Sequence, residues 1–169
     1  MEPIIKKIWT LIMMMSVSIP ISAYNFTVDG IYYNILTDKT SVEVTYRDKN
    51  YDTYIGEIII PSEVSYNGKN YTVTEIGSNA FYKCSTMTSI TLPTSINKIE
   101  LNAFEGANHI QKVHISDLSA WCMIDFKYVS SCPLKYGGTL YLNNEPVTSL
   151  EFLDSSCTTI AKYAFYDCI

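Results

Sequence analysis

The chain has few charges and no excess of basic residues. Charged residues make up 17% of its 169 residues, and 12 Lys and Arg stand against 17 Asp and Glu, for a net charge of −5. Proteins that bind nucleic acids or anionic membrane surfaces do so mainly through clustered Lys and Arg. The acidic balance therefore argues against both as partners.

Sequence motifs for catalysis, phosphate binding and metal binding are also missing. The chain has no Gly-rich phosphate loop, no His-Glu-x-x-His, no Gly-x-Ser-x-Gly and no Cys-x-x-Cys. A nucleophilic pair of Cys122 with one of the two histidines, His109 or His114, is an alternative, with Asp117 or Asp125 to orient the imidazole. No protease signature surrounds these residues. We therefore predict a protein without catalysis, cofactor or metal.

Long apolar runs are absent except near the N-terminus. Two lysines there precede an uncharged run of 14 residues over residues 8–21, which contains Pro20 and is followed by the small Ala23. Crossing about 30 Å of hydrocarbon needs roughly 20 residues. A basic start, a short apolar run and a small residue at the cut are typical of a secretory signal peptide. We predict a signal peptide over residues 1–23, export, and no stable membrane span after cleavage; a membrane anchor is the alternative.

What the sequence does contain is an internal repeat. Ala80-Phe81 returns one period later as Ala103-Phe104, and again as Ala164-Phe165. Four further apolar positions keep the offset between the first two copies: Ile76 and Ile99, Met87 and Ile110, Ile90 and Val113, Leu92 and Ile115. A period of roughly 20–30 residues with apolar positions in fixed phase is typical of a solenoid. One such unit cannot bury its apolar side chains alone, so the units are expected to stack.

Each repeat contains a candidate strand and a candidate wedge between layers. Ile90 and Leu92 lie two positions apart and therefore point to one face of a strand, which Pro93 should end. Ala103 is small where two layers approach, and Phe104 can fill the gap between them. The fold class that we predict is a mainly-β repeat solenoid: a leucine-rich-repeat parallel β ladder with short helices or turns on its outer side.

The segment before the repeats has a different pattern. Residues 24–57 alternate apolar and polar side chains without a helical period, and turn formers such as Asp29-Gly30 punctuate them. This pattern predicts short antiparallel strands that form an N-terminal β cap. Repeats then fill residues 58–169. The first is enlarged, because the spacing from Ile58 to the equivalent Ile90 exceeds the period of the later copies.

A 38-residue insert at about residues 116–153 interrupts the repeats. It begins with an N-cap-like Asp117, followed by apolar residues at helical spacing, which predicts a short helix. Two alternating runs around Asn143-Asn144 then predict a β-hairpin. Leu150 and Phe152 are expected to supply the strand of the following repeat.

Residues 76–96 read Ile-Gly-x-x-Ala-Phe-x-x-Cys-x-x-Met-x-x-Ile-x-Leu-Pro-x-x-Ile. This phrase closely resembles the BspA-like, or treponemal-type, leucine-rich repeat of bacterial surface proteins. The insert, through residues 115–122 and 140–143, and the lead-in at residues 28–33 are also similar to that family. The resemblance covers roughly residues 28–169. It implies a secreted or surface-exposed protein whose role is adhesion or binding rather than catalysis.

The five cysteines leave at least one thiol unpaired in an exported protein, because their number is odd. Cys84 and Cys168 occupy the position that Ala107 fills in another repeat, so we interpret them as small buried side chains. They also lie several repeats apart, too far for a disulfide. Cys122 and Cys132 both lie in the insert and are the candidate disulfide.

Polar residues that alternate with the buried strand positions should line the exposed side of the ladder. These candidate binding residues are Ser89, Thr91, Lys112, His114, Ser149 and Glu151. The alternative is that they are ordinary solvated strand residues. We predict a secreted or cell-surface adhesion or binding module for a protein or glycan.

A structural spacer, or a fragment of a larger exported repeat protein, is the alternative function. The third Ala-Phe copy is followed by only four residues, so the C-terminal repeat is expected to be incomplete, without a strand of its own. An open repeat of this kind would leave a strand edge through which the chain could self-associate.

Overall fold

The computed structural model describes residues 22–149 and 157–166. The chain is mainly β, with few and short helices. Its strands are β1 (Phe26–Val28), β2 (Ile31–Ile35), β3 (Ser41–Thr45), β4 (Gly56–Ile59), β5 (Glu63–Tyr66), β6 (Lys69–Ile76), β7 (Met87–Thr91), β8 (Lys98–Ile99), β9 (Lys112–Ile115), β10 (Asp125–Phe126), β11 (Thr139–Leu142) and β12 (Glu145–Pro146). The helices are α2 (Leu118–Cys122) and the 3₁₀ turns η1 (Val129–Ser131) and η2 (Pro133–Tyr136). Nearly all of the predicted signal peptide lies outside the described residues, and within them no helix is long and apolar enough to cross a membrane.

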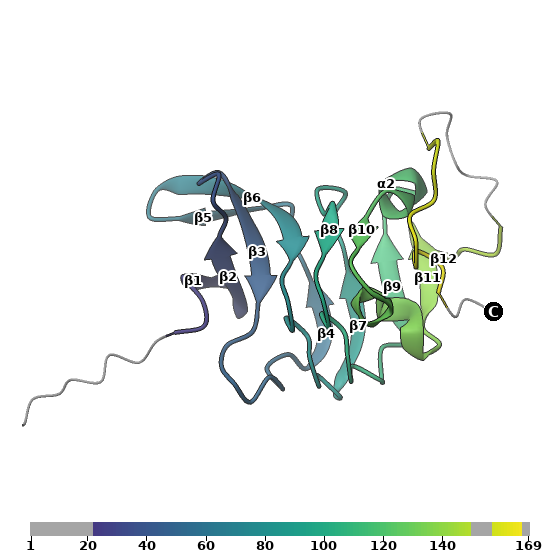
Figure 1. Cartoon of the computed structure of the whole chain (residues 1–169), viewed down its shortest axis with the longest axis horizontal. Coiled ribbons are helices and arrows are strands. Elements are labelled where there is room, and N and C mark those ends of the chain that lie inside the picture. Colours follow the sequence, from purple (N-terminus) through teal and green to yellow (C-terminus); the bar gives the residue numbers. More distant parts are fainter. Residues whose placement is uncertain (1–21, 150–156, 167–169) are drawn as a thin grey trace, which may run out of the picture.

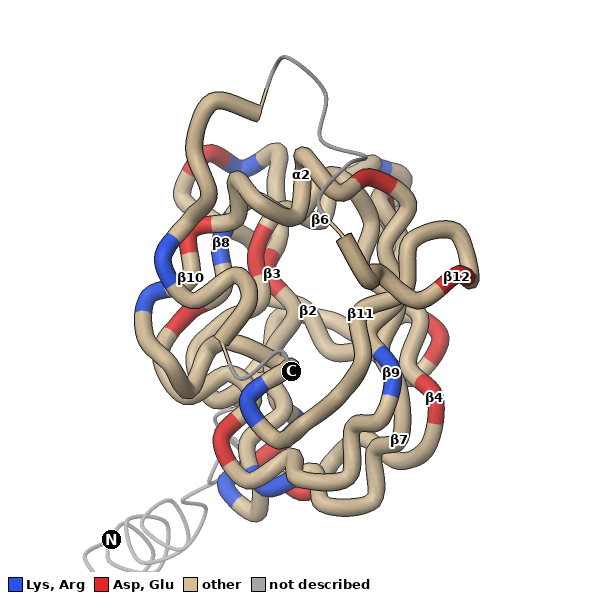
Figure 2. Tube along the Cα trace, turned by 90° about the vertical axis from the view of Figure 1, so that its right-hand side faces the viewer, with Lys and Arg blue, Asp and Glu red and all other residues tan. Residues whose placement is uncertain are grey.

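The strands of two sheets succeed one another along the long axis of the molecule (Figure 1). The first sheet has the order β1-β2-β3-β6-β8-β10, with β5 beside β6, and the second has the order β12-β11-β9-β7-β4. From β3 to β11 the chain alternates between the sheets, with β5 as an additional strand of the first, and β12 follows β11 in the second. Figure 2 shows the two sheets on opposite sides, with β3, β8 and β10 facing β4, β7 and β9. The sequence pattern predicts one parallel ladder, whereas the structure has two.

Parallel pairing of the repeats places equivalent apolar side chains in register across each sheet, although the spacing between them along the chain varies. Parallel pairing aligns β3, β6, β8 and β10 in the first sheet and β4, β7, β9 and β11 in the second. The resulting buried rows are Val44, Ile76, Ile99 and Phe126 in the first sheet, and Ile90, Val113 and Leu140 in the second. Both rows belong to one hydrophobic core. The residues that alternate with them face outward, because successive side chains on a strand point to opposite faces.

The Ala-Phe phrase lies in the turns that lead from the first sheet to the second. The rings of Phe81 and Phe104 are buried and stacked, with centroids 5.0 Å apart. The Phe81 N–H donates to the Ala103 carbonyl at 2.8 Å, and the Phe104 N–H donates to the Ser130 carbonyl at 3.1 Å. The phrase is therefore the predicted wedge, formed by a turn rather than a helix, and it also links each repeat to the next.

The N-terminal strands are antiparallel, as their alternation predicts. β1 pairs with β2 and β2 with β3, and β3 then pairs in parallel with β6. Tyr54 fastens the loop after β3 to this region. Its buried hydroxyl accepts from the Tyr32 N–H at 3.2 Å and donates to the Thr45 carbonyl at 2.5 Å. The first sheet thus continues beyond the repeats without a break.

The predicted insert contains both the helix and the hairpin, but it also supplies ladder strands. Asp117 caps α2, since its Oδ1 accepts from the Ala120 N–H at 2.9 Å. β11 and β12 pair antiparallel around Asn143 and Asn144, both at positive φ. However, β11 also pairs in parallel with β9. This strand takes the ladder position next to β9. Leu150 and Phe152, the residues expected to supply the strand of the following repeat, lie outside the described part of the chain.

Candidate functional site

The outward side chains of the second sheet form one surface, which we call the ladder face. Parallel pairing brings β4, β7, β9 and β11 side by side, so that equivalent outward positions stand in rows across them. The ladder face consists of Glu57, Ile59, Ser89, Thr91, Lys112, His114, Thr139 and Tyr141.

An aromatic and basic group occupies the β9–β11 end of the ladder face. His114 and Tyr141 are direct neighbours in register, and their rings stack with centroids 5.2 Å apart. The Lys112 Nζ lies 5.8 Å from the centroid of the Tyr141 ring, within the range of a cation–π contact. A stacked ring pair beside an ammonium group offers both an apolar surface and a positive charge to a ligand.

Four of the six predicted binding residues lie on this face. Lys112 is exposed, Thr91 and His114 are half-buried, and Ser89 is almost covered by its neighbours. Ser149 is predicted as an outward strand residue, and in the structure it lies in an irregular segment after β12. Glu151 lies outside the described residues.

Tyr141, the residue that contacts both His114 and Lys112, is absent from the sequence-based prediction. The sequence pattern indicates Thr139–Leu142 as a strand of a hairpin but not as a ladder strand. Its alternation is visible in the sequence, with Leu140 inward and Tyr141 outward. The missing information is the parallel partner β9, which the helix α2, the strand β10 and two 3₁₀ turns separate from β11 along the chain.

A hollow of about 410 Å³ opens beside this group, between the start of β9 and the start of β11. Asn108, His109, Gln111 and Tyr136 line it together with Lys112 and Tyr141. The Tyr136 hydroxyl accepts from the Gly106 N–H at 3.0 Å, which holds the ring at the wall. At Gly138 a Cβ would lie 2.9 Å from the Ile110 carbonyl oxygen, so glycine lets the two segments approach. The hollow therefore combines rings, amides and charge.

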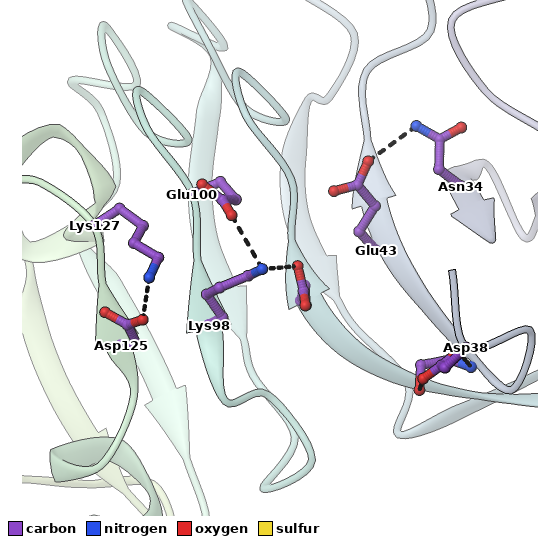
Figure 3. Close-up of polar contacts among 9 residues, drawn as sticks. Asn34, Asp38, Glu43, Lys98, Glu100, Asp125 and Lys127 are labelled. Atoms are coloured by element: carbon purple, nitrogen blue, oxygen red, sulfur yellow. Dashed lines mark hydrogen bonds and ion pairs between the residues drawn. The ribbon is translucent and has the colours of Figure 1, made fainter. Parts of the chain in front are cut away.

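The outward side of the first sheet has another character, and we call it the charged face. One row of it runs in register through Asn34, Glu43, Glu75, Lys98 and Asp125. Figure 3 shows Lys98 between acidic side chains. Its Nζ is 2.7 Å from a Glu75 oxygen and 3.1 Å from a Glu100 oxygen. The hydrogen bond to Glu75, more than any other contact, raises the pKa of Lys98.

Two further carboxylates of the charged face also have partners within the molecule. Asp125 pairs with Lys127, and Glu43 Oε1 accepts from the Asn34 amide at 3.0 Å. Burial raises the pKa of Glu43, and the nearby carboxylates of Glu75 and Glu100 raise it further. These charged side chains therefore have polar partners within the molecule.

The cysteines do not form the predicted disulfide. Cys122 is a free thiol, and the Cys157 thiol lies beside it. Burial, and after it Cys157, raises the pKa of the Cys122 thiol to about 12. Helix α2 brings Cys122 to the segment at residues 157–166, where the Ala161 N–H donates to the Cys122 carbonyl at 2.7 Å. A thiol with so high a pKa supplies little thiolate for nucleophilic attack.

Cys84 is a small buried side chain, as its place in the repeat predicts. Its thiol donates to the Tyr51 carbonyl at 3.4 Å, and burial raises the pKa of this thiol. The equivalent Cys168 lies outside the described residues. Cys84 therefore contributes to the core of the repeat rather than to chemistry.

The other candidate catalytic groups have structural roles. Asp117 caps α2, Asp125 pairs with Lys127, and His114 stacks on Tyr141. In the part of the chain that the structure describes, no group of three or more His, Cys, Asp and Glu side chains is placed to hold a metal ion. The ladder face with its hollow is thus the candidate site.

Three solved structures illustrate what the fold is similar to. A leucine-rich cell surface protein from Faecalibacterium prausnitzii is 24% identical with a TM-score of 0.47, over 58% of this chain and 24% of its own. A leucine-rich repeat protein from Bacteroides ovatus is 21% identical with a TM-score of 0.42, over 69% of this chain and 37% of its own. A leucine-rich repeat protein from Bacteroides capillosus is 27% identical with a TM-score of 0.44, over 59% of this chain and 75% of its own. The chain thus spans well under half the length of the first two.

No curated protein matches the chain. A family model does: that of the BspA type leucine rich repeat region, in six copies, matches residues 51–169. The match covers both ladders of the described structure from β4 onward. It includes all the positions of the ladder face. The chain therefore belongs to the BspA-type leucine-rich repeat family.

Proposed function

We propose that the chain is a non-catalytic binding module exposed on a bacterial cell surface or secreted from the cell, with the ladder face as its ligand-binding surface. In this proposal, residues 1–23 direct export, residues 24–57 cap the stack, and the repeats form a solenoid. The ligand is a protein or a glycan. Membership of the BspA-type repeat family supports a role in binding or adhesion.

The observation that carries the proposal is the availability of the polar groups on the ladder face. Within residues 22–149 and 157–166, Lys112 forms no ion pair, and its ammonium group lies over the ring of Tyr141. The acidic and basic side chains of the charged face are instead engaged with one another. A charged group without an ionic partner inside the molecule stays available to a ligand.

The hollow beside β9 and β11 favours a saccharide as the ligand. A sugar ring presents C–H groups that pack on an aromatic face such as Tyr141, and hydroxyls that pair with amides such as Gln111. Lys112 at the rim adds a charged donor for an acidic sugar. Few convergent polar groups around a partly apolar wall are typical of ligand sites.

Binding of the full chain to arrays of glycans and of extracellular proteins tests this proposal. The variant Lys112→Gln/His114→Asn/Tyr141→Ala removes the aromatic and basic group. The matched control is Lys127→Gln/Tyr128→Ala, which removes a lysine and an exposed tyrosine elsewhere. We expect the ladder-face variant to lose at least about tenfold in affinity and the control to bind normally. Equal binding of both variants to every ligand would contradict the proposal.

A further inference from the structure

The two sheets end differently at the N-terminal side of the molecule. The first sheet continues past β3 to β2 and β1, whereas the second stops at β4. A hollow of about 440 Å³ lies at this step, lined by the turn between β1 and β2, by β4 and by the start of β5. We call it the edge pocket. It shares no lining residue with the hollow beside β9 and β11, which lies at the other end of the second sheet.

The edge pocket contains an unpaired strand edge. The Gly56 N–H donates to the Thr86 carbonyl and the Ile60 N–H to the Thr91 carbonyl, both at 3.0 Å, so the even-numbered residues of β4 face β7. In a parallel ladder the backbone groups of Glu57 and Ile59 then face the other way. There β4 has no partner strand among the described residues. Such an edge is a template for an added extended chain.

A buried tyrosine that lines the pocket lacks a hydrogen-bond partner. Tyr33 is 0% exposed, and its hydroxyl makes no hydrogen bond in the described structure. The nearby Tyr54 is also buried, but its hydroxyl has two backbone partners. Buried polar groups are nearly always satisfied, and leaving one unpaired destabilises the protein. Tyr33, the residue that carries this unpaired hydroxyl, is among the residues that line the edge pocket.

The charge of the lining indicates the kind of occupant. Asp29, Glu57 and Glu63 are exposed at the pocket, and no Lys, Arg or His is among the lining residues. Glu63 accepts a hydrogen bond from Asn70, and none of the three carboxylates forms an ion pair with another described residue. Ile31 and Val64 give the pocket an apolar wall. A lysine or arginine side chain, with a cationic head on an apolar stem, matches this combination.

We propose that the edge pocket binds an extended basic peptide, which adds as a strand beside β4 and places a Lys or Arg side chain against Asp29 and Glu57. The peptide backbone pairs with the free groups of Glu57 and Ile59. The edge pocket shares Glu57 and Ile59 with the ladder face, but it lies at the other end of the second sheet from the hollow beside β9 and β11, so its test does not depend on the ligand proposed there. The charge of the pocket selects the partner, and the strand edge orients it.

Calorimetric titration of the full chain with a blocked octapeptide of alternating Lys and Val tests the proposal. Asp29→Asn and Glu57→Gln should each weaken binding by about tenfold, because each removes a charged partner. Glu145→Gln makes the same change of charge on the exposed β12 and should bind as the wild type does. An equal loss of peptide affinity in Glu145→Gln would contradict binding at the edge pocket and would indicate general electrostatic attraction instead.

Tyr33→Phe separates a binding role of the hydroxyl from a structural one. Removing an unsatisfied hydroxyl should leave the denaturation midpoint of the free protein unchanged or raised. Peptide affinity should fall by about threefold to tenfold. Unchanged peptide affinity in Tyr33→Phe would overturn the role of Tyr33, and a lowered midpoint would show that the hydroxyl is satisfied within the fold.

Strand addition itself has a separate readout. Peptide binding should slow hydrogen exchange at the amides of Glu57 and Ile59, and a peptide N-methylated on alternate amides should not bind. Equal binding of the N-methylated peptide, or of 1,5-diaminopentane, would show that the pocket takes an amine without a strand. Self-association of the free chain that Glu57→Gln abolishes would identify a second copy as the occupant. Either result overturns the peptide proposal.

Discussion

The charged face and the ladder face are built on the same repeat but use their outward side chains in opposite ways. On the charged face, Lys98 pairs with Glu75 of the neighbouring strand β6 and with Glu100, which directly follows β8. On the ladder face, Lys112 forms no ion pair with any described residue and lies over the ring of Tyr141. Both faces cover the same core, so the difference comes from the outward residues alone.

This difference separates side chains that stabilise the fold from side chains that are available to a partner. Exposed ion pairs typically contribute about 0–1 kcal/mol, and networks with partly buried members contribute more. The side chains of Lys98 and Glu75 are 28% and 17% exposed, so their pairing is partly shielded from water. Substitutions should therefore affect stability on the charged face and binding on the ladder face.

Phe81→Ala should destabilise both sheets together and have the largest effect on the free energy of unfolding. Phe81 is 0% exposed and stacks on Phe104 between the two sheets. Its truncation leaves a cavity, and we expect the free energy of unfolding to fall by about 3–5 kcal/mol. Urea denaturation measures the change. Leu101→Ala is the control at a neighbouring exposed turn position, and a change of similar size there would refute the wedge role of Phe81.

The stability of the two faces can be compared directly with the variants Lys98→Gln and Lys112→Gln, since each removes one positive charge. Without Lys98, Glu75 and Glu100 lose their common partner, and we expect a loss of about 1–2 kcal/mol in the free energy of unfolding. Lys112→Gln should stay within about 0.5 kcal/mol of the wild type. Chemical denaturation of both variants at low salt checks this. Equal losses would mean that the two faces do not differ.

Glu43→Gln should stabilise the protein at neutral pH, by about 0.5–1 kcal/mol. Burial raises the pKa of Glu43 in the folded chain, so folding favours its protonated form. The wild type accordingly loses stability as pH rises through the titration of Glu43, whereas Gln stays neutral.

The gain in Glu43→Gln should therefore disappear below about pH 4, where the wild-type carboxyl is also protonated. Thermal denaturation at a series of pH values measures it. Glu145→Gln, at an exposed position, is the control and should show no comparable dependence. A gain that is the same at all pH values would point to a cause other than ionisation.

The repeat and its core could be predicted from the sequence because they depend on local spacing. Ile76 and Ile99, or Ile90 and Val113, keep the same phase and so occupy equivalent buried places in successive repeats. The short helix was also predictable, since Asp117 is a strong N-cap residue directly before apolar residues at helical spacing. These signals need no knowledge of distant contacts.

The parallel ladder of the first sheet could not be predicted from the sequence in the same way. β8 and β10 are each two residues long, too short to show the alternation that identifies a strand. The neighbourhood of Cys122 was equally hidden, because it depends on a contact between α2 and residues 157–166 that no local sequence pattern indicates. For the same reason, the sequence pattern places Tyr141 in a hairpin and not on the ladder face.

By itself, the sequence determined which side chains are buried and how often they recur, and thereby the family to which the chain belongs. Only the tertiary structure decided which polar side chains meet. Lys98 reaches Glu75 in the preceding repeat, and Tyr141 reaches His114 on the neighbouring ladder strand. Burial follows from the hydrophobicity of each residue, whereas a cross-strand pair depends on register, which is set by the length and path of the whole intervening chain.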